Sequence, residues 1–178
     1  MEPIFIWWIG EEEAEPDLLD HVALHLGRSF RRPVARWEGV ERPRHAYDPK
    51  RKQHASGTIL KWLLQEGPGA GKVLGITDRD LFIPILTYVF GEAQLGGRAA
   101  LVSLARLRED VEVMGRRLLV ERLAKEAVHE VGHAFGLVHC ELAACVMSRS
   151  AGVRDVDEKD PGLCADCQAR LEELAGGR

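Results

Sequence analysis

The sequence has 178 residues, which is enough for one compact domain with a sizeable core and too few for two ordinary domains. Hydrophobic residues make up 46% of the chain and charged residues 29%, a balance that excludes an intrinsically disordered protein. The formal net charge of −4, without a sustained stripe of lysine and arginine, argues against a nucleic-acid partner, because such binding requires basic groups that neutralise phosphates.

The beginning of the chain predicts a strand, a helix and a second strand. Residues 4–9 form an apolar run typical of a buried strand, and the acidic residues 11–13 follow it where a signal peptide would have a cleavage site. Pro16 suits the start of a helix whose apolar face ends near Gly27, and residues 34–37 suit a short strand. The first run is too short to cross a membrane, so we expect a cytoplasmic protein.

The middle of the chain predicts short elements joined by loops. Prolines and charges in residues 41–57 indicate a long loop. Residues 59–64 suit a short helix, residues 72–78 a strand and residues 99–107 another strand. The apolar segment 80–94 contains a proline and is interpreted as strand and loop.

The clearest helix begins after Gly115 and is predicted to end at Gly136. Its apolar residues recur at intervals of three and four: Val120, Ala124, Ala127, Val128, Val131 and Phe135. Gly136 can adopt the left-handed conformation that ends a helix. The order of strands and helices indicates a single α/β or α+β domain over residues 1–178.

This helix carries the sequence HEVGHAFGLVH at residues 129–139. His129 and His133 are four residues apart, so their rings leave one face of the helix on adjacent turns and can share a metal ion. The turn at Gly136 allows His139 to approach as a third ligand. Three neutral imidazoles leave the fourth position of a tetrahedral zinc open to water, and Glu130 is placed to accept a proton from that water. A bare HExxH arises often by chance, but the additional glycine and third histidine favour the catalytic zinc.

The four cysteines all lie in the C-terminal segment 140–178, as a pair at Cys140 and Cys145 and a second pair at Cys164 and Cys167. Two close pairs separated by a longer loop suit a closed, structural zinc site with four thiolate ligands. The alternatives are free buried cysteines or two disulfides, which a reducing cytoplasm disfavours. We therefore predict two zinc ions per chain, one catalytic and one structural.

Together these residues resemble the archaemetzincin family of zinc-dependent peptidases. The segments that carry the resemblance are HEVGHAFGLVHC (129–140), Cys145, Met147, CADC (164–167), AYDPKRKQ (46–53), GITDRDLFIP (75–84), FGEA (90–93) and GRAALVSLARL (97–107). They extend over most of the chain, and the long zinc motif is highly specific. The spacing of 16 residues between Met147 and Cys164 is slightly shorter than is usual in the family.

The resemblance implies a compact metzincin-like fold, with a mixed, mostly parallel twisted sheet and a long active-site helix. It also implies that His129, His133 and His139 bind the catalytic zinc and that the four cysteines bind the second zinc. Met147 would form the Met-turn beneath the catalytic metal, although on its own it would be interpreted as a core methionine that fills a gap.

One metzincin feature is missing, because the two tyrosines, Tyr47 and Tyr88, both precede the helix. Neither can be a tyrosine that follows the Met-turn and stabilises an oxyanion. The loop containing Tyr47, Arg51 and His54 is a candidate source of an additional donor, and the alternative is that this loop is a solvated surface turn.

The predicted function is hydrolysis of peptide bonds by a water on the three-histidine zinc, activated by Glu130. An edge strand near residues 90–94 would hold an extended peptide by main-chain pairing. The alternative is a non-catalytic, zinc-stabilised module that binds peptides or proteins. Nucleic-acid binding through the four-cysteine segment is disfavoured, because that segment is acidic. We expect a monomer with a peptide or protein substrate and no membrane partner.

Overall fold

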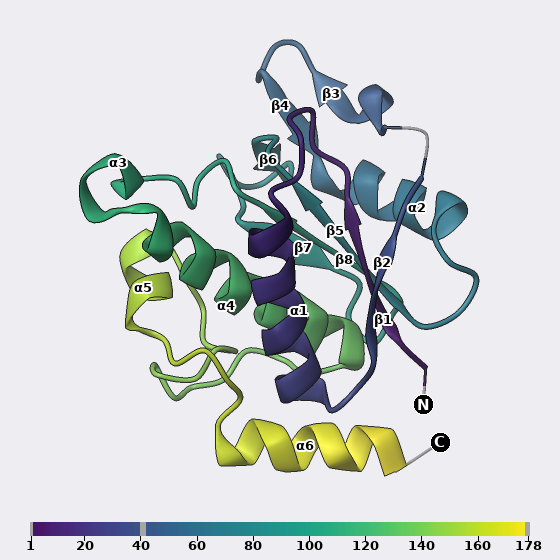
Figure 1. Cartoon of the computed structure of the whole chain (residues 1–178), viewed down its shortest axis with the longest axis vertical. Helices are drawn as coiled ribbons and strands as arrows, with labels where there is room; N and C mark the ends of the chain where they lie inside the picture. Colours follow the sequence, from purple (N-terminus) through teal and green to yellow (C-terminus); the bar gives the residue numbers. More distant parts are fainter. Residues whose placement is uncertain (1, 40–41, 177–178) are drawn as a thin grey trace.

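The computed structural model describes residues 2–39 and 42–176, which are built around a five-stranded sheet (Figure 1). The strand order is β2-β1-β5-β8-β7, in which the first four strands are parallel and β7 is antiparallel to β8. The strands are β1 (Ile4–Trp8), β2 (Val34–Trp37), β5 (Lys72–Thr77), β7 (Gly91–Ala93) and β8 (Ala99–Ser103). The expected mixed, mostly parallel sheet is therefore confirmed, and β7 is at its edge.

Helices cover both faces of this sheet (Figure 1). Helices α1 (Pro16–Phe30) and α4 (Arg116–Phe135) pack on one face, and α2 (Ser56–Glu66) packs on the other. Three shorter or peripheral helices follow the last strand: α3 (Val111–Met114), α5 (Val153–Glu158) and α6 (Ala165–Gly176). None of the helices in the described ranges combines the length and the apolarity that crossing a membrane requires.

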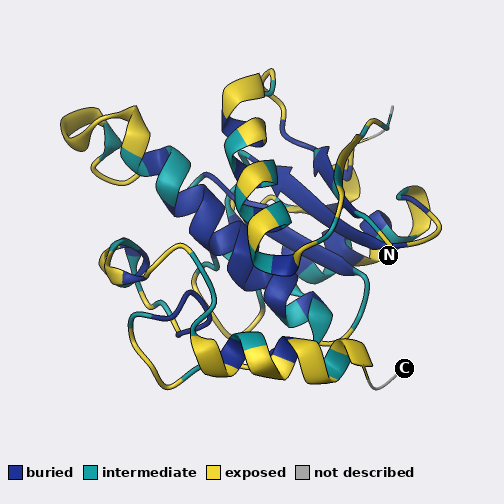
Figure 2. Ribbon diagram, turned by 60° about the horizontal axis from the view of Figure 1, so that its bottom comes forward, coloured by how far each residue is buried: buried dark blue, intermediate teal, exposed yellow. Residues whose placement is uncertain are grey.

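The central strands are buried on both faces, which explains their nearly continuous apolar sequences. Every residue of β5 is buried. Leu74 and Ile76 belong to the core beneath α1 and α4, whereas Val73 belongs to the core beneath α2. Alternate residues of a strand point to opposite faces, so one short run supplies both cores. Figure 2 shows that burial extends from the sheet along most of α4.

Two predicted boundaries were wrong because the chain turns at other residues than expected. Helix α1 continues past Gly27 and ends at Phe30, and the next residue, Arg31, adopts a left-handed conformation with φ of 51°. The strand predicted over residues 99–107 ends at Ser103, whose hydroxyl accepts a hydrogen bond from the Ala105 N–H. A hydroxyl that bonds the backbone two residues later favours a turn over an extended chain.

The predicted loop 41–57 also contains regular structure, apart from residue 41, which lies outside the described residues. It forms a short 3₁₀ helix, η1 (Arg44–Ala46), and an antiparallel pair, β3 (Tyr47–Asp48) and β4 (Gln53–Ala55), before α2 begins at Ser56. The Asp48 carboxylate accepts hydrogen bonds from the N–H groups of Lys50 and Arg51, which closes the turn between the strands. Strand β4 then pairs with β6 (Leu81–Phe82) in a small second sheet.

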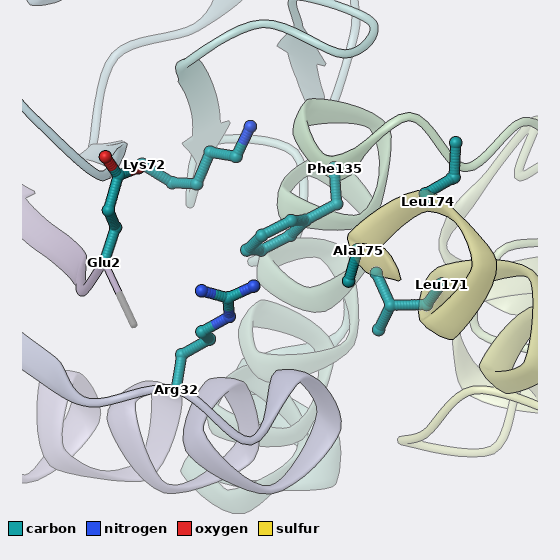
Figure 3. A pocket seen from close by; sticks show the side chains of 7 residues that line it. All are labelled: Glu2, Arg32, Lys72, Phe135, Leu171, Leu174 and Ala175. Atoms are coloured by element: carbon teal, nitrogen blue, oxygen red, sulfur yellow. The ribbon is translucent and has the colours of Figure 1, made fainter. Parts of the chain in front are cut away.

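A buried lysine anchors the C-terminal end of α4. The Lys72 ammonium donates hydrogen bonds to Gly97 O at 2.6 Å and to Ala134 O at 2.7 Å, and it lies 4.9 Å from the centre of the Phe135 ring. Figure 3 shows Lys72 and Arg32 reaching toward this ring in a cavity of about 270 Å³ that α6 closes from the far side. The end of the helix is thereby held against the sheet at the point where the chain turns toward His139.

Candidate active site

Helix α4 and the turn that follows it bring the three predicted histidines together. His129 and His133 lie one turn apart on α4. Gly136 ends the helix with φ of 101°, and its N–H donates to Gly132 O and His133 O. The chain then folds back to His139, and one ring nitrogen of each histidine lies within 4.8 Å of the other two.

Backbone carbonyls fix the orientation of two of these rings. His129 Nδ1 lies 2.8 Å from Val146 O, and His133 Nδ1 lies 2.7 Å from Leu137 O. A carbonyl oxygen only accepts, so the proton of each neutral ring is on Nδ1 and the lone pair is on Nε2.

The two Nε2 atoms, of His129 and His133, lie 3.1 Å apart. Two lone pairs at that distance repel each other unless a cation lies between them. Tetrahedral zinc with Zn–N bonds of about 2.0–2.1 Å separates its nitrogen ligands by about 3.3 Å. The geometry of the pair therefore fits a zinc ion.

The electrostatic environment keeps the three histidines neutral. Burial lowers the pKa of His129 well below its usual value, and burial also lowers the pKa values of His133 and His139. Metal ions bind the neutral imidazole, so these rings are in the binding form at neutral pH.

Glu130 is buried beside the histidines and is enclosed by strand β7. A side-chain carbon at Gly91 of β7 would lie 2.6 Å from Glu130 Cγ and 2.4 Å from Leu101 O, so only glycine fits there. Burial, and then the charges of Glu126 and Glu92, raise the pKa of Glu130 well above its usual value. A cation held by the histidines would favour the carboxylate, which could then accept a proton.

A cleft runs past this site in two halves, and Gly91, His129, Glu130 and His139 line both of them. One half, of about 510 Å³, is also lined by residues 86–90, Glu126 and residues 149–151. The other half, of about 390 Å³, is also lined by residues 92–93, Leu95, His133 and Val138. The edge strand β7 thus lies along the cleft, in the region where the sequence predicted a peptide-binding edge.

Met147 lies against the middle of the histidine motif. A side-chain carbon at Gly132 would lie 2.5 Å from the Met147 sulfur, so the glycine in HEVGH allows the methionine to approach α4 closely. Met147 is fully buried, and its carbonyl accepts a hydrogen bond from Cys140 N–H at 3.0 Å. This is the position beneath the histidine helix that the resemblance implied for a Met-turn.

The four cysteines converge in a second cluster. Sγ of Cys140 lies 3.8 Å from that of Cys164, Sγ of Cys145 lies 3.8 Å from that of Cys167, and all four cysteines are free thiols. Tetrahedral zinc with Zn–S bonds of about 2.3 Å separates its sulfur ligands by about 3.8 Å. The alternative of two disulfides is wrong for this structure, because a disulfide requires about 2.05 Å. Burial raises the pKa values of Cys145 and Cys167, so thiolates there need a neighbouring cation.

The suggested donor loop contributes no side chain to the lining of the cleft, because Tyr47, Arg51 and His54 are not among the residues that line it. Tyr47 packs against His54, and the Arg51 guanidinium donates at 3.1 Å to the carbonyl of Leu86, which does line the cleft. Tyr88 lines the cleft instead, and its hydroxyl donates to Ala151 O at 3.2 Å. No local pattern marked Tyr88, because it reaches the site only through the path of residues 83–90.

A buried ion pair lies one helical turn before Glu130. The Lys159 ammonium, with 1% of its side chain exposed, lies 3.4 Å from Glu126 Oε1, and the Glu126 side chain is 4% exposed. Burial raises the pKa of Glu126. Sequence reasoning missed this pair because 33 residues separate its members.

Comparisons with known proteins point to one family. The profile of peptidase family M54 matches residues 69–173, more than half of the chain. The chain is 39% identical over 154 residues to the archaemetzincin of Methanopyrus kandleri, covering 86% of this chain and 83% of that protein. It is 43% identical over 137 residues to the archaemetzincin of Methanocaldococcus jannaschii, covering 75% and 74%. The crystal structure of the Methanopyrus kandleri protein superposes with a TM-score of 0.83 at 32% identity, over 98% of this chain and 96% of the other.

Proposed function

This chain belongs to the archaemetzincins of peptidase family M54, which makes it a zinc metallopeptidase, and we propose that its three clustered histidines hold the catalytic zinc beside Glu130 as the general base. The proposed ligands are His129, His133 and His139. The observation that carries this assignment is the distance of 3.1 Å between Nε2 of His129 and Nε2 of His133. In both rings the proton is on Nδ1, which donates to a backbone carbonyl, so the two Nε2 atoms face each other with lone pairs. Such an approach is favourable with a cation between the lone pairs.

The residues around the site suit hydrolysis of a peptide bond. A zinc ion on three neutral imidazoles supplies a more acidic water and polarises a peptide carbonyl. Glu130 accepts a proton from the attacking water and then transfers it to the leaving amine. Its burial against Gly91 holds the carboxylate in place, and the carbonyls of Val146 and Leu137 hold two of the rings.

The substrate is a peptide, and strand β7 is proposed to hold it in an extended conformation. Within the described part of the chain, β7 is an edge strand of the five-stranded sheet and has β8 as its one neighbour there. Backbone groups on an exposed edge can pair with an added strand. Because Gly91 touches Glu130, the cleaved bond would lie beside Gly91, with the peptide extending into both halves of the cleft.

The four cysteines are proposed to bind a structural zinc that supports the catalytic site. The backbone between Cys145 and Met147 includes Val146, whose carbonyl orients His129. A closed site with four protein ligands leaves no position for water, so this ion would stabilise the fold without taking part in hydrolysis.

The decisive experiment compares wild type with Glu130→Gln. We expect two zinc ions per chain in both proteins by elemental analysis, and cleavage of a mixed peptide library by wild type alone. Glu121→Gln, on the same helix but away from the cleft, is the matched control and should cleave normally. Equal cleavage by wild type and Glu130→Gln would refute the assigned base. Two zinc ions with no cleavage by wild type would favour the non-catalytic binding module.

We also propose that residues 1–178 act as one domain and as a monomer in the cytoplasm. The four-thiolate cluster supports this location, because a reducing compartment keeps the cysteines available to a metal. Light scattering after size-exclusion chromatography tests the monomer, and a mass of two chains would refute it.

A further inference from the structure

Arg149 is an uncommitted cation in the wall of the cleft. It is exposed and lines the half-cleft of residues 86–91 together with His139 and Glu130. Its guanidinium forms neither a hydrogen bond nor an ion pair with any residue in the ranges 2–39 and 42–176. Other basic side chains that contact residues of this half have partners: Lys159 pairs with Glu126, Arg106 pairs with Asp80, and Arg51 donates to Leu86 O. Arg149 therefore places a positive charge in the cleft where a substrate would lie.

The backbone that carries Arg149 is held on both sides. Before it, Met147 O accepts from Cys140 N–H, and the Ser148 hydroxyl donates to Ala143 O at 2.9 Å. After it, the Asp155 carboxylate accepts from the Ala151 N–H at 2.6 Å. A fixed backbone reduces the entropy lost when the side chain binds a partner.

The direction of β7 indicates which part of a peptide Arg149 would meet. An edge strand can pair with a peptide in either direction, and antiparallel pairing is the more stable of the two. A peptide antiparallel to β7 places its C-terminal part beside the residues that precede Gly91. Those residues and Arg149 line the same half of the cleft. Arg149 would therefore face the portion of the substrate that follows the cleaved bond.

We propose that Arg149 selects peptides with a carboxylate directly after the cleaved bond. The guanidinium is a planar fork of donors that matches a carboxylate with two parallel hydrogen bonds. The carboxylate could be an acidic side chain or the C-terminus of a short peptide, since both present the same chemistry. Glu126, which lines the same half of the cleft, is offset by Lys159 at 3.4 Å. Arg149 also lines a neighbouring hollow with Glu141, Asp155 and Glu158, and forms no ion pair with any of the three. This inference rests on the proposed peptidase function, because it assigns specificity to that same cleft.

The test uses zinc-loaded protein and matched peptides built on a sequence that the library shows to be cleaved. One set carries Glu, Gln or Lys after the cleaved bond, and a second set ends at that position as a free acid or an amide. We expect wild type to show a kcat/KM at least tenfold higher for a carboxylate-bearing peptide than for its neutral counterpart, which is modest for a charge-assisted pair. Arg149→Gln should abolish the preference, and Arg149→Lys should retain part of it.

The control variant is Arg154→Gln, which removes an exposed arginine from α5 outside the cleft and should keep the wild-type preference. A preference limited to free acids would identify the C-terminal carboxylate as the source, and one limited to Glu peptides would identify the side chain. Equal rates for charged and neutral peptides in wild type, or a preference that survives in Arg149→Gln, would overturn the proposal.

Peptide binding gives a readout that does not need turnover. Calorimetry with zinc-loaded Glu130→Gln should show tighter binding of the carboxylate-bearing peptide, and the added Arg149→Gln change should remove the difference. Such a difference without cleavage by wild type would support the carboxylate site and refute the assigned reaction. Cleavage without any difference would support the reaction and refute the role of Arg149.

Discussion

Gly91 and Glu130 lie so close together that the proposed base fits only because position 91 of β7 has no side chain. The contact joins an edge strand to the active-site helix, because a carbon at position 91 would meet both Glu130 Cγ at 2.6 Å and Leu101 O at 2.4 Å. The strand that we expect to hold the peptide and the residue that we expect to move the proton are therefore positioned against each other.

Gly91→Ala should reduce both stability and activity. The added methyl group must displace the Glu130 side chain and the β8 backbone, so we expect a loss of about 1–3 kcal/mol in unfolding free energy and up to about a 100-fold lower kcat. Urea denaturation and peptide turnover measure the two effects. Gly69→Ala is the control, since no atom lies within 4 Å of a side-chain carbon there. Wild-type kcat in Gly91→Ala would contradict the packing argument.

Cys164→Ser should weaken zinc binding at both sites. Loss of one thiolate releases the structural ion, and the segment from Cys145 to Met147, whose Val146 carbonyl orients His129, loses its anchor. Support of this kind is worth about 10–100-fold in metal affinity. Competition with a chromophoric chelator measures the affinity of the histidine site, and Asp166→Ser, between the cysteines of the CADC motif, is the control. Unchanged affinity at the histidines would show that the two sites are independent.

Lys159→Met should destabilise the fold by leaving the Glu126 carboxyl buried without its partner. Removal of one member of a buried ion pair costs about 3–5 kcal/mol. The raised pKa of Glu126 allows it to be protonated, which favours the lower end of that range. Chemical denaturation of Lys159→Met, Glu126→Gln and the double variant forms a double-mutant cycle. The double variant should recover part of the unfolding free energy that Lys159→Met loses. Lys61→Met, on the exposed face of α2, controls for loss of a lysine, and a purely additive cycle would exclude coupling.

His54 should make the fold less stable in mild acid. Burial lowers its pKa, although Asp78 and Asp80 act in the opposite direction, and the Arg79 guanidinium lies 3.1 Å from its Nε2. Because the unfolded state, with a histidine pKa of about 6.5, binds the proton first, the unfolding free energy should fall as the pH drops below that value.

His54→Gln should make the pH dependence of unfolding below about 6.5 shallower. The exposed His45→Gln variant is the control for the loss of a histidine. Denaturant unfolding of all three proteins between neutral pH and mild acid measures the slopes. Identical slopes for wild type and His54→Gln would show that His54 does not contribute.

The zinc motifs could be predicted from the sequence because their geometry is mostly local. His129, Glu130 and His133 share a single helix, and one glycine turn returns the chain to His139, so helical periodicity was sufficient to bring them together. The paired spacing of the cysteines predicted the second cluster in the same way. Apolar runs also located the main strands, because both faces of a covered parallel sheet are buried.

The surroundings of the zinc motifs were decided by the tertiary structure. Three contacts around the site join segments that are distant in the sequence: Gly91 lies against Glu130, Tyr88 donates to Ala151, and Lys159 pairs with Glu126. They form only because the fold packs these segments against one another. The segment predicted as a loop forms a strand pair around the turn at Asp48. No pattern in the sequence marked Arg149, which the fold places beside the cleft. Sequence by itself determined the chemistry that the chain can perform, since spacing along one helix sets which ligands meet. The tertiary structure decided which substrate groups that chemistry meets, because the cleft is made by long-range packing that no local pattern encodes.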